Sequence, residues 1–177
     1  MQPADIEIIP LLVSEWRAYR RLRLEALRDS PQAFGTKYAD MQTKPDHFWQ
    51  ARLEDAGKGE HSWLFFARSG RDLVGMIGAV REDLDGSQLT GALATIISVY
   101  VTPSARGRGI SSLLMSAILA KLSQNGFQKV QLGVTADQTA AVRLYQRFGF
   151  AILKTEIERM GDGLDHTGYL MEKTLLI

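Results

Sequence analysis

The spacing of hydrophobic residues changes several times along the chain, and each change predicts a new element. Apolar residues recur near helical spacing and predict helices over about 14–28, 46–55, 110–122 and 137–148. Alternating or β-branched runs predict strands over 6–9, 63–68, 73–80, 92–102, 130–135, 150–158 and 168–174. Ser14 and Asp137 stand where helix N-caps are expected, and Gly149 is expected to end the last helix.

The order of these elements predicts a mixed architecture. Ser69-Gly70-Arg71-Asp72 separates two strands and is typical of an antiparallel hairpin turn. The strand over 92–102, the helix after it and the strand over 130–135 predict a right-handed parallel crossover. We therefore expect an α/β fold of the α+β type, with the 177 residues forming one domain.

Composition narrows the function classes. The chain contains 21 Lys plus Arg, 20 Asp plus Glu and no Cys. The absence of Cys excludes disulfides, zinc–thiolate sites and a cysteine nucleophile. Balanced charge argues against a globally basic nucleic-acid binder, and no apolar run approaches the roughly 18 residues that span a membrane. The N-terminal residues do not resemble a signal peptide, so we expect a cytoplasmic protein without nucleic-acid or membrane partners.

The charge is unevenly distributed along the chain. The 51 residues from Gly86 to Ala136 contain no Asp or Glu but hold two Arg and two Lys, a local charge of +4. Because the whole chain carries +1, all other residues together carry −3. This segment is therefore expected to meet an anionic ligand.

The segment from Ser98 to Leu114 carries the main chemical signal. A buried strand leads into Arg106-Gly-Arg-Gly109, and an amphipathic helix begins directly afterwards. Glycines let backbone amides approach a ligand, and a helix N-terminus favours anions. With the cationic side chains of Arg106 and Arg108, the pattern indicates a phosphate or pyrophosphate site.

Of three phosphate-binding motifs, two do not fit this loop and the third does. A Walker loop requires Lys after the last glycine, and a Rossmann fingerprint requires a third glycine where Ser112 stands. Arg106-Gly-Arg-Gly-Ile-Ser111 resembles the [RQ]-x-x-G-x-[GA] loop of the GNAT superfamily of N-acetyltransferases, with Ser in place of the last small residue. Residues from Leu132 to Phe150 resemble the second signature of that family, and Ala141–Phe150 fit it without a gap.

The resemblance implies acetyl-CoA as the acyl donor. It implies a mostly antiparallel central sheet with a splayed parallel strand pair and flanking helices. The pantetheine arm would run along Val99, Tyr100 and Val101, and Gln138 stands where the family often has Asn. The pyrophosphate would lie on the loop and helix start, formed by Arg106, Gly107, Arg108, Gly109, Ile110, Ser111 and Ser112.

The resemblance also implies a direct attack of an amine on the thioester. Tyr145 resembles the general acid of the family, and a free Tyr, with a pKa of about 10, is protonated at neutral pH. The alternative for Tyr145 is a core aromatic. The general base stays open, because the strand before the loop carries no acid; Glu82, Asp83 and Asp85 lie just upstream of that strand. His47, His61 and His166 are isolated in sequence and predict no metal site.

The acceptor is expected to be a small-molecule or peptide amine. Residues 34–38 and the loop after Glu158 are expected to form its pocket, with Phe34, Tyr38, Phe48 and Trp49 either lining the pocket or packing in the core. Two other functions stay open, a non-catalytic acyl-CoA sensor with the same fold and a nucleotide-phosphate binder. A homodimer is an expectation from the resemblance alone.

Overall fold

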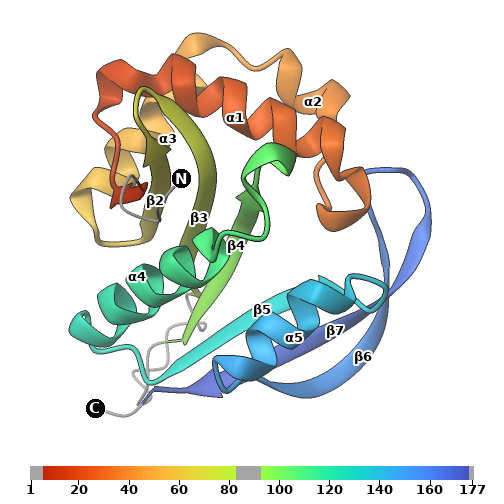
Figure 1. Cartoon of the computed structure of the whole chain (residues 1–177). Coiled ribbons are helices and arrows are strands. Elements are labelled where there is room, and N and C mark those ends of the chain that lie inside the picture. Colours follow the sequence, from red (N-terminus) through yellow and green to blue (C-terminus); the bar gives the residue numbers. More distant parts are fainter. Residues whose placement is uncertain (1–5, 83–92, 176–177) are drawn as a thin grey trace.

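A seven-stranded sheet forms the centre of the computed structural model, which describes residues 6–82 and 93–175 (Figure 1). The strands are β1 (Ile6–Ile9), β2 (Ser62–Ser69), β3 (Asp72–Glu82), β4 (Leu93–Val101), β5 (Lys129–Thr135), β6 (Ala151–Arg159) and β7 (Asp165–Thr174). Their order in the sheet is β1-β2-β3-β4-β5-β7-β6. Every neighbouring pair is antiparallel except β4 and β5, so the expected mixed fold with one parallel pair is confirmed.

Within the described residues, five α-helices cover the two faces of the sheet. They are α1 (Trp16–Asp29), α2 (Tyr38–Gln42), α3 (Asp46–Lys58), α4 (Ile110–Gln124) and α5 (Thr139–Arg147). Apolar residues of α1, α2 and α3 pack with Phe66, Met76 and Tyr100 in one core cluster. Those of α4 and α5 form a second cluster on the other face, with Ile77 and Leu132 among its fully buried members. The sheet therefore has a hydrophobic core on each side.

The side chains near the end of strand β4 alternate between the two cores. The Tyr100 side chain belongs to the cluster under α1, whereas Val99 and Val101 pack against the cluster under α4. This alternation follows from the two-residue period of a strand. Because β4 is followed directly by a loop and α4, the same strand also positions the glycine loop between the two halves of the sheet (Figure 1).

Two helix starts differ from the sequence prediction. A 3-10 turn over Val13–Glu15 precedes α1, and the N-cap of α1 is Glu15 rather than Ser14. The Glu15 carboxylate accepts a hydrogen bond from the Leu12 amide at 2.9 Å and pairs with Arg68, which stabilises this tighter turn. At α5 the N-cap is Gln138, one residue after the predicted Asp137. No helix within 6–82 and 93–175 is long and apolar enough to cross a membrane.

Candidate active site

Strands β4 and β5 pair only over their first residues. The parallel register runs from Leu93 opposite Lys129 to Ile96 opposite Leu132. Beyond Ile96 the edge of β4 that faces β5 has no strand partner, while β5 stays paired with β7 along its whole length. Figure 1 shows the two strands diverging toward the glycine loop. The expected splayed parallel pair is therefore present.

A β-bulge in β4 marks the point where the strands diverge. Met76 pairs with Tyr100 and Gly78 with Ile97, so Ile77 faces both Ser98 and Val99. Ser98 has a φ of 58°, a left-handed conformation that costs a non-glycine residue roughly 1–3 kcal/mol. Bulges re-aim backbone groups next to functional sites. Here the bulge redirects the backbone of Val99 away from the regular ladder.

A cavity of about 640 Å³ lies beside the C-terminal end of β4 and the glycine loop. Its walls come from Val99–Val101, from residues 105–112 without Arg108, and from Gln138 and one side of α5 that includes Tyr145. We call it the loop cavity. It brings together all but one of the residues predicted to bind the cofactor.

The loop at one end of this cavity is built to present backbone amides. Gly107 and Gly109 have φ values of 75° and 76°, which L side chains rarely adopt. A Cβ added at either glycine would meet no atom within 4 Å. Because α4 begins at Ile110, the amides of Ile110 and Ser111 have no acceptor in the helix and lie at the positive end of its dipole, whereas the Ser112 amide donates to the Gly109 carbonyl oxygen at 3.0 Å. The open space and the free amides fit a pyrophosphate.

The two arginines of the loop are placed differently from the sequence expectation. Arg106 donates from Nε to the Val101 carbonyl oxygen at 3.0 Å, and its Nη2 pairs with Asp29 at 2.5 Å. Arg108 is not part of the cavity lining, and its Nη2 is buried without a partner among the described residues. In this conformation Arg106 joins the loop to α1, and the backbone amides of the loop stay available to an anion.

The Tyr100 side chain also points away from the loop cavity. Its hydroxyl donates a hydrogen bond to Glu25 at 3.1 Å, and burial is the main cause that raises its pKa above the usual value. Only the main chain of Tyr100 can therefore contact a ligand in the cavity. Val99 and Val101 lie on the opposite face of β4, toward the cluster under α4.

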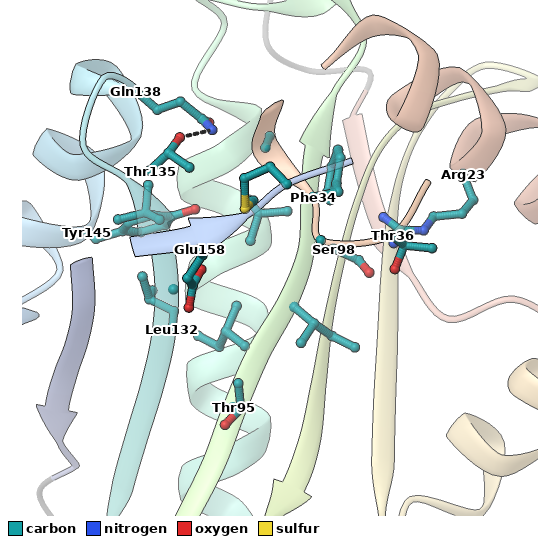
Figure 2. A pocket seen from close by; sticks show the side chains of 18 of the residues that line it. Arg23, Phe34, Thr36, Thr95, Ser98, Leu132, Thr135, Gln138, Tyr145 and Glu158 are labelled. Atoms are coloured by element: carbon teal, nitrogen blue, oxygen red, sulfur yellow. Dashed lines mark hydrogen bonds between the residues drawn. The ribbon is translucent and has the colours of Figure 1, made fainter. Parts of the chain in front are cut away.

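A second cavity of about 450 Å³ adjoins the first, and we call it the inner cavity (Figure 2). Phe34, Val99, Gln138 and Tyr145 line both cavities. The inner cavity extends across β4 and β5 to α1, where Arg23 lines it. The two cavities therefore meet at the bulge, beside Tyr145.

Tyr145 is a buried residue with its hydroxyl directed toward the inner cavity (Figure 2). Its ring meets Phe150 edge-on, with 6.2 Å between the ring centroids. Burial raises the pKa of Tyr145 to about 12, because the ionised form would lose its hydration. The hydroxyl therefore keeps its proton through the neutral range.

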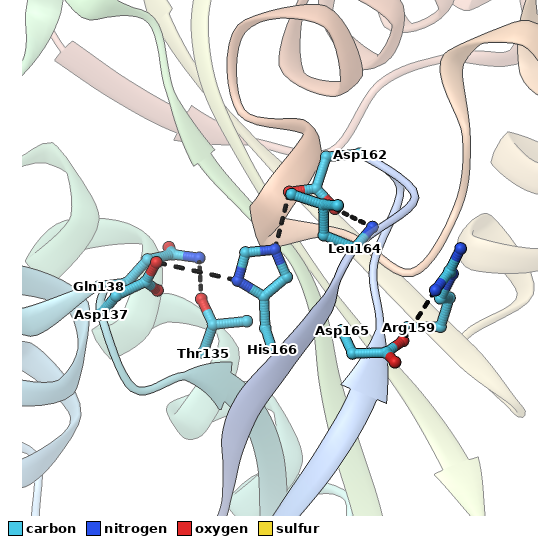
Figure 3. Close-up of polar contacts among 8 residues, drawn as sticks. All are labelled: Thr135, Asp137, Gln138, Arg159, Asp162, Leu164, Asp165 and His166. Atoms are coloured by element: carbon cyan, nitrogen blue, oxygen red, sulfur yellow. Dashed lines mark hydrogen bonds and ion pairs between the residues drawn. The ribbon is translucent and has the colours of Figure 1, made fainter.

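The turn before α5 holds Gln138 through a short polar network (Figure 3). Its Nε2 donates to Thr135 Oγ1 at 2.8 Å, so the amide oxygen takes no part in this hydrogen bond. Asp137, the predicted cap, instead faces Nδ1 of His166 at 3.9 Å, and Nε2 of that ring lies 2.7 Å from Asp162. His47 and His61 are exposed, as their isolated positions suggested. The described residues contain no group of three or more His, Cys, Asp or Glu that could hold a metal.

The sequence analysis gave no role to one carboxylate that lies at the inner cavity. Glu158, near the end of β6, lines the inner cavity together with Tyr145. Glu82 pairs with Leu93 at the opposite end of β4 from Ser98, and Asp83 and Asp85 lie outside the described residues. The pairing of β6 beside β7, which brings Glu158 to the cavity, has no signal in a single sequence.

Two segments far apart in the chain close the inner cavity. Phe34, Gly35 and Thr36 form one part of its wall, and Met160 after β6 forms another. The Gly161 amide donates to the Phe34 carbonyl oxygen at 2.6 Å, which joins the two segments. Both were the segments expected to form the acceptor pocket.

Three aromatic residues suggested for that pocket are not part of it. Tyr38 accepts a hydrogen bond from Arg28 at 2.5 Å, and the Arg28 guanidinium stacks on its ring. Trp49 is fully buried and meets Tyr19 and Phe48 edge-on. Core packing therefore accounts for Phe48 and Trp49.

The sequence matches the model of the acetyltransferase (GNAT) family over residues 17–150. A mycothiol acetyltransferase of Brachybacterium faecium is 28% identical over 145 residues, which is 77% of this chain and 43% of the relative. One of Salinispora tropica is 32% identical over 135 residues, 76% of this chain and 40% of the relative. The chain thus spans less than half the length of these two relatives.

Solved structures share the fold at low identity. A GNAT-family acetyltransferase from Streptococcus pneumoniae superposes with a TM-score of 0.80 at 17% identity, covering 96% of this chain and 99% of the other. The Arabidopsis thaliana protein NAA60 in complex with acetyl-CoA gives 0.71 at 20% identity, covering 96% and 98%. The family model covers well over half of the chain, and both motifs lie at the diverging strands. The chain therefore belongs to the GNAT family of acetyltransferases.

Proposed function

We propose that this chain is an N-acetyltransferase that transfers an acetyl group from acetyl-CoA to a primary amine, with residues 1–177 forming one catalytic domain. The observation that carries the proposal is the meeting of the loop cavity and the inner cavity at Val99 and Tyr145. One cavity fits a phosphate-bearing ligand and the other leads to it from α1. Two reactants entering from these two sides would meet at the bulge.

The loop cavity suits the acyl donor, which supplies a thioester carbonyl and a thiol leaving group when bound. The amides of Gly107 to Ser111 would hold its pyrophosphate, with Ser112 in the same cavity wall. The free edge of β4 at Val99 and Val101 would pair with its amide-containing arm, as an added strand does. Gln138 and the main chain of Tyr100 would complete this wall.

Three groups of the chain would assist the transfer. A backbone N–H at Val99 or Val101 would stabilise the negative charge that develops on the carbonyl oxygen. Glu158 would accept the proton that the amine loses as its nitrogen bonds to the acetyl carbon. Tyr145 would donate its proton to the sulfur as the carbon–sulfur bond breaks, and its raised pKa keeps that proton available.

The acceptor in this proposal is a primary amine. The two relatives carry the name mycothiol acetyltransferase, which supports acetyl transfer in general. Their modest identity and greater length do not carry the acceptor over to this chain.

The test is a screen of primary amines with acetyl-CoA that follows CoA release. The chain has no Cys, so a thiol reagent detects only the thiol released from CoA. We expect turnover with at least one amine class above the background hydrolysis. Tight binding of acetyl-CoA without turnover of any amine would contradict catalysis and favour the sensor function instead.

A further inference from the structure

Arg23 is a buried cation that the proposed mechanism does not use. It lies on the inner face of α1, only 7% of its surface is exposed, and it lines the inner cavity. Its Nη1 has no hydrogen-bond partner among the described residues, and none of the ion pairs there includes Arg23. Buried guanidinium groups are ordinarily paired, because an uncompensated buried charge is costly.

The packing around Arg23 explains its position but not its free donors. The guanidinium carbon lies 4.7 Å from the centroid of the Phe34 ring, a cation–π contact. Such a contact uses the flat face of the guanidinium. The N–H groups lie in its plane and stay available for a planar, bidentate acceptor.

A second arginine adds positive charge on the same side of the inner cavity. Arg52 lines the cavity and donates from Nε to the Tyr19 hydroxyl at 2.9 Å. The pKa of Arg23 is lowered to about 10, mainly by burial and in part by repulsion from Arg52, while Tyr19 opposes both effects. Arg23 still carries its charge at neutral pH, so an anion between the two arginines would relieve both the burial cost and the repulsion.

The inner cavity therefore carries opposite charges on its two sides. Arg23 and Arg52 are its cationic members, and Glu158 is its anionic member. Figure 2 shows Tyr145 and Glu158 beside β5, and Arg23 on the other side of the cavity beyond Ser98. A ligand spanning the cavity would place an amine near Glu158 and Tyr145 and a negative group at Arg23.

We propose that the acceptor is an amino-acid-like amine, whose carboxylate forms a bidentate pair with the Arg23 guanidinium while its amine faces Tyr145 and Glu158. This substrate class presupposes the acetyl transfer proposed above. A volume of about 450 Å³ suits a small molecule of this kind. Arg23 would thus determine specificity, holding the acceptor by the end that does not react.

The experiment compares matched acceptors on wild-type protein and on Arg23→Gln. Each amino acid is paired with its carboxamide and its decarboxylated amine, and kcat/KM is measured at saturating acetyl-CoA. For the wild type we expect a preference of about 100-fold for the carboxylate form, since a buried charge pair depends on both partners. In Arg23→Gln this preference should disappear, while the Kd for CoA should stay within about twofold of the wild-type value.

Two further variants separate specificity from stability. Arg23→Lys keeps the charge but not the bidentate geometry, so we expect an intermediate preference. Arg21→Gln removes an exposed arginine of the same helix and should leave the preference intact. Circular dichroism of each variant checks that it folds; if Arg23→Gln does not fold, Arg23→Lys carries the test.

Binding without turnover gives an independent measurement. Heteronuclear NMR titration of the CoA-saturated protein with amino acids and their amides reports the Kd directly. Carboxylate-dependent binding that is lost in Arg23→Gln, without turnover of any amine, would support the acceptor class while contradicting the proposed catalysis. Equal kcat/KM and Kd for acids and amides, or a preference for aminoalkyl phosphonates or sulfonates over carboxylates, would overturn the inference.

Discussion

Tyr145 illustrates how the environment of one residue determines its chemistry. The second family motif identifies it, yet only the structure shows a buried phenol at the junction of two cavities. Burial moves the pKa of Tyr145 upward to about 12, so the protonated form predominates at every pH at which the protein is expected to work. The same burial keeps the phenol able to donate one proton at the junction of the two cavities.

Replacing Tyr145 with Phe should lower kcat while leaving the binding of acetyl-CoA nearly unchanged. Loss of a general acid typically costs about 100-fold or more in rate. The wild-type pH–rate profile should show no decline attributable to Tyr145 below about pH 11, because its pKa is near 12. Tyr38→Phe is the matched control, since that hydroxyl contacts Arg28 outside the cavities. An unchanged kcat in Tyr145→Phe would contradict the assignment.

Single residues were predictable where a local motif dictates the backbone. Gly107 and Gly109, which the loop pattern singled out, both line the loop cavity, and the structure gives them positive φ values. Arg106 was not predictable in the same way, because its partner Asp29 is 77 residues away in the chain. Nothing in the sequence identified Arg23 as a cavity residue, since its burial depends on how α1 packs on the sheet.

At the scale of elements, strand β4 and helix α4 form the unit that builds the loop cavity. The bulge at Ser98 ends the pairing with β5, and the glycine loop directs the following amides into the space that opens. The packing of α4 on β2 and β3 fixes the helix start relative to the strand. Small changes in the loop should therefore affect ligand binding more than stability.

Replacing Gly109 with Ala should weaken CoA binding at a moderate cost in stability. A Cβ meets no atom there, but a φ of 76° costs an L residue about 1–2 kcal/mol, and relaxation would turn the amides away. Gly70→Ala is the matched control, because its φ is 60° and its Cβ position is equally open in the β2–β3 turn. We expect similar losses in Tm for both and an increased Kd for CoA, measured by calorimetry, in Gly109→Ala alone. Equal Kd values would contradict the role of the loop.

Replacing Gly161 with Ala should disturb the inner cavity and leave the loop cavity intact. The added Cβ would lie 2.7 Å from the Thr36 carbonyl oxygen and 2.9 Å from that of Phe34, so the two backbone segments must separate. We expect the KM for the amine to rise severalfold with an unchanged Kd for CoA. Gly57→Ala, where a Cβ meets nothing within 4 Å, is the control outside both cavities. An unchanged KM for the amine would show that this contact does not shape the cavity.

The sequence predicted the long elements better than the short ones. Periodic apolar residues located β4 and α4 within one or two positions. Helix α2 has only five residues, too few for a periodic pattern, and it was missed. Strand β7 begins at Asp165, three residues before the prediction, because pairing with β6 extends it over polar positions that alternation alone does not mark.

At the scale of the whole molecule, the net charge of +1 conceals an uneven distribution of charge along the chain. The acid-free segment from Gly86 to Ala136 includes β4, the glycine loop, α4 and β5, and carries +4. The remaining residues carry −3 and include Glu158 at the inner cavity. An anionic donor and an amine acceptor would therefore be drawn to different parts of one surface.

This distribution predicts how ligands stabilise the whole molecule. A ligand that binds only the folded state adds about 2.7 kcal/mol at 100 times its Kd, which corresponds to a rise in Tm of roughly 5–10 °C for a domain of this size. CoA and acetyl-CoA should give such a rise, because they offer both a pyrophosphate for the loop and an arm for the free edge of β4. ATP offers the phosphates without the arm and should give a smaller rise at the same concentration. Thermal denaturation with each ligand measures the difference, and stabilisation by ATP alone would contradict acetyl-CoA binding and indicate a nucleotide-phosphate site.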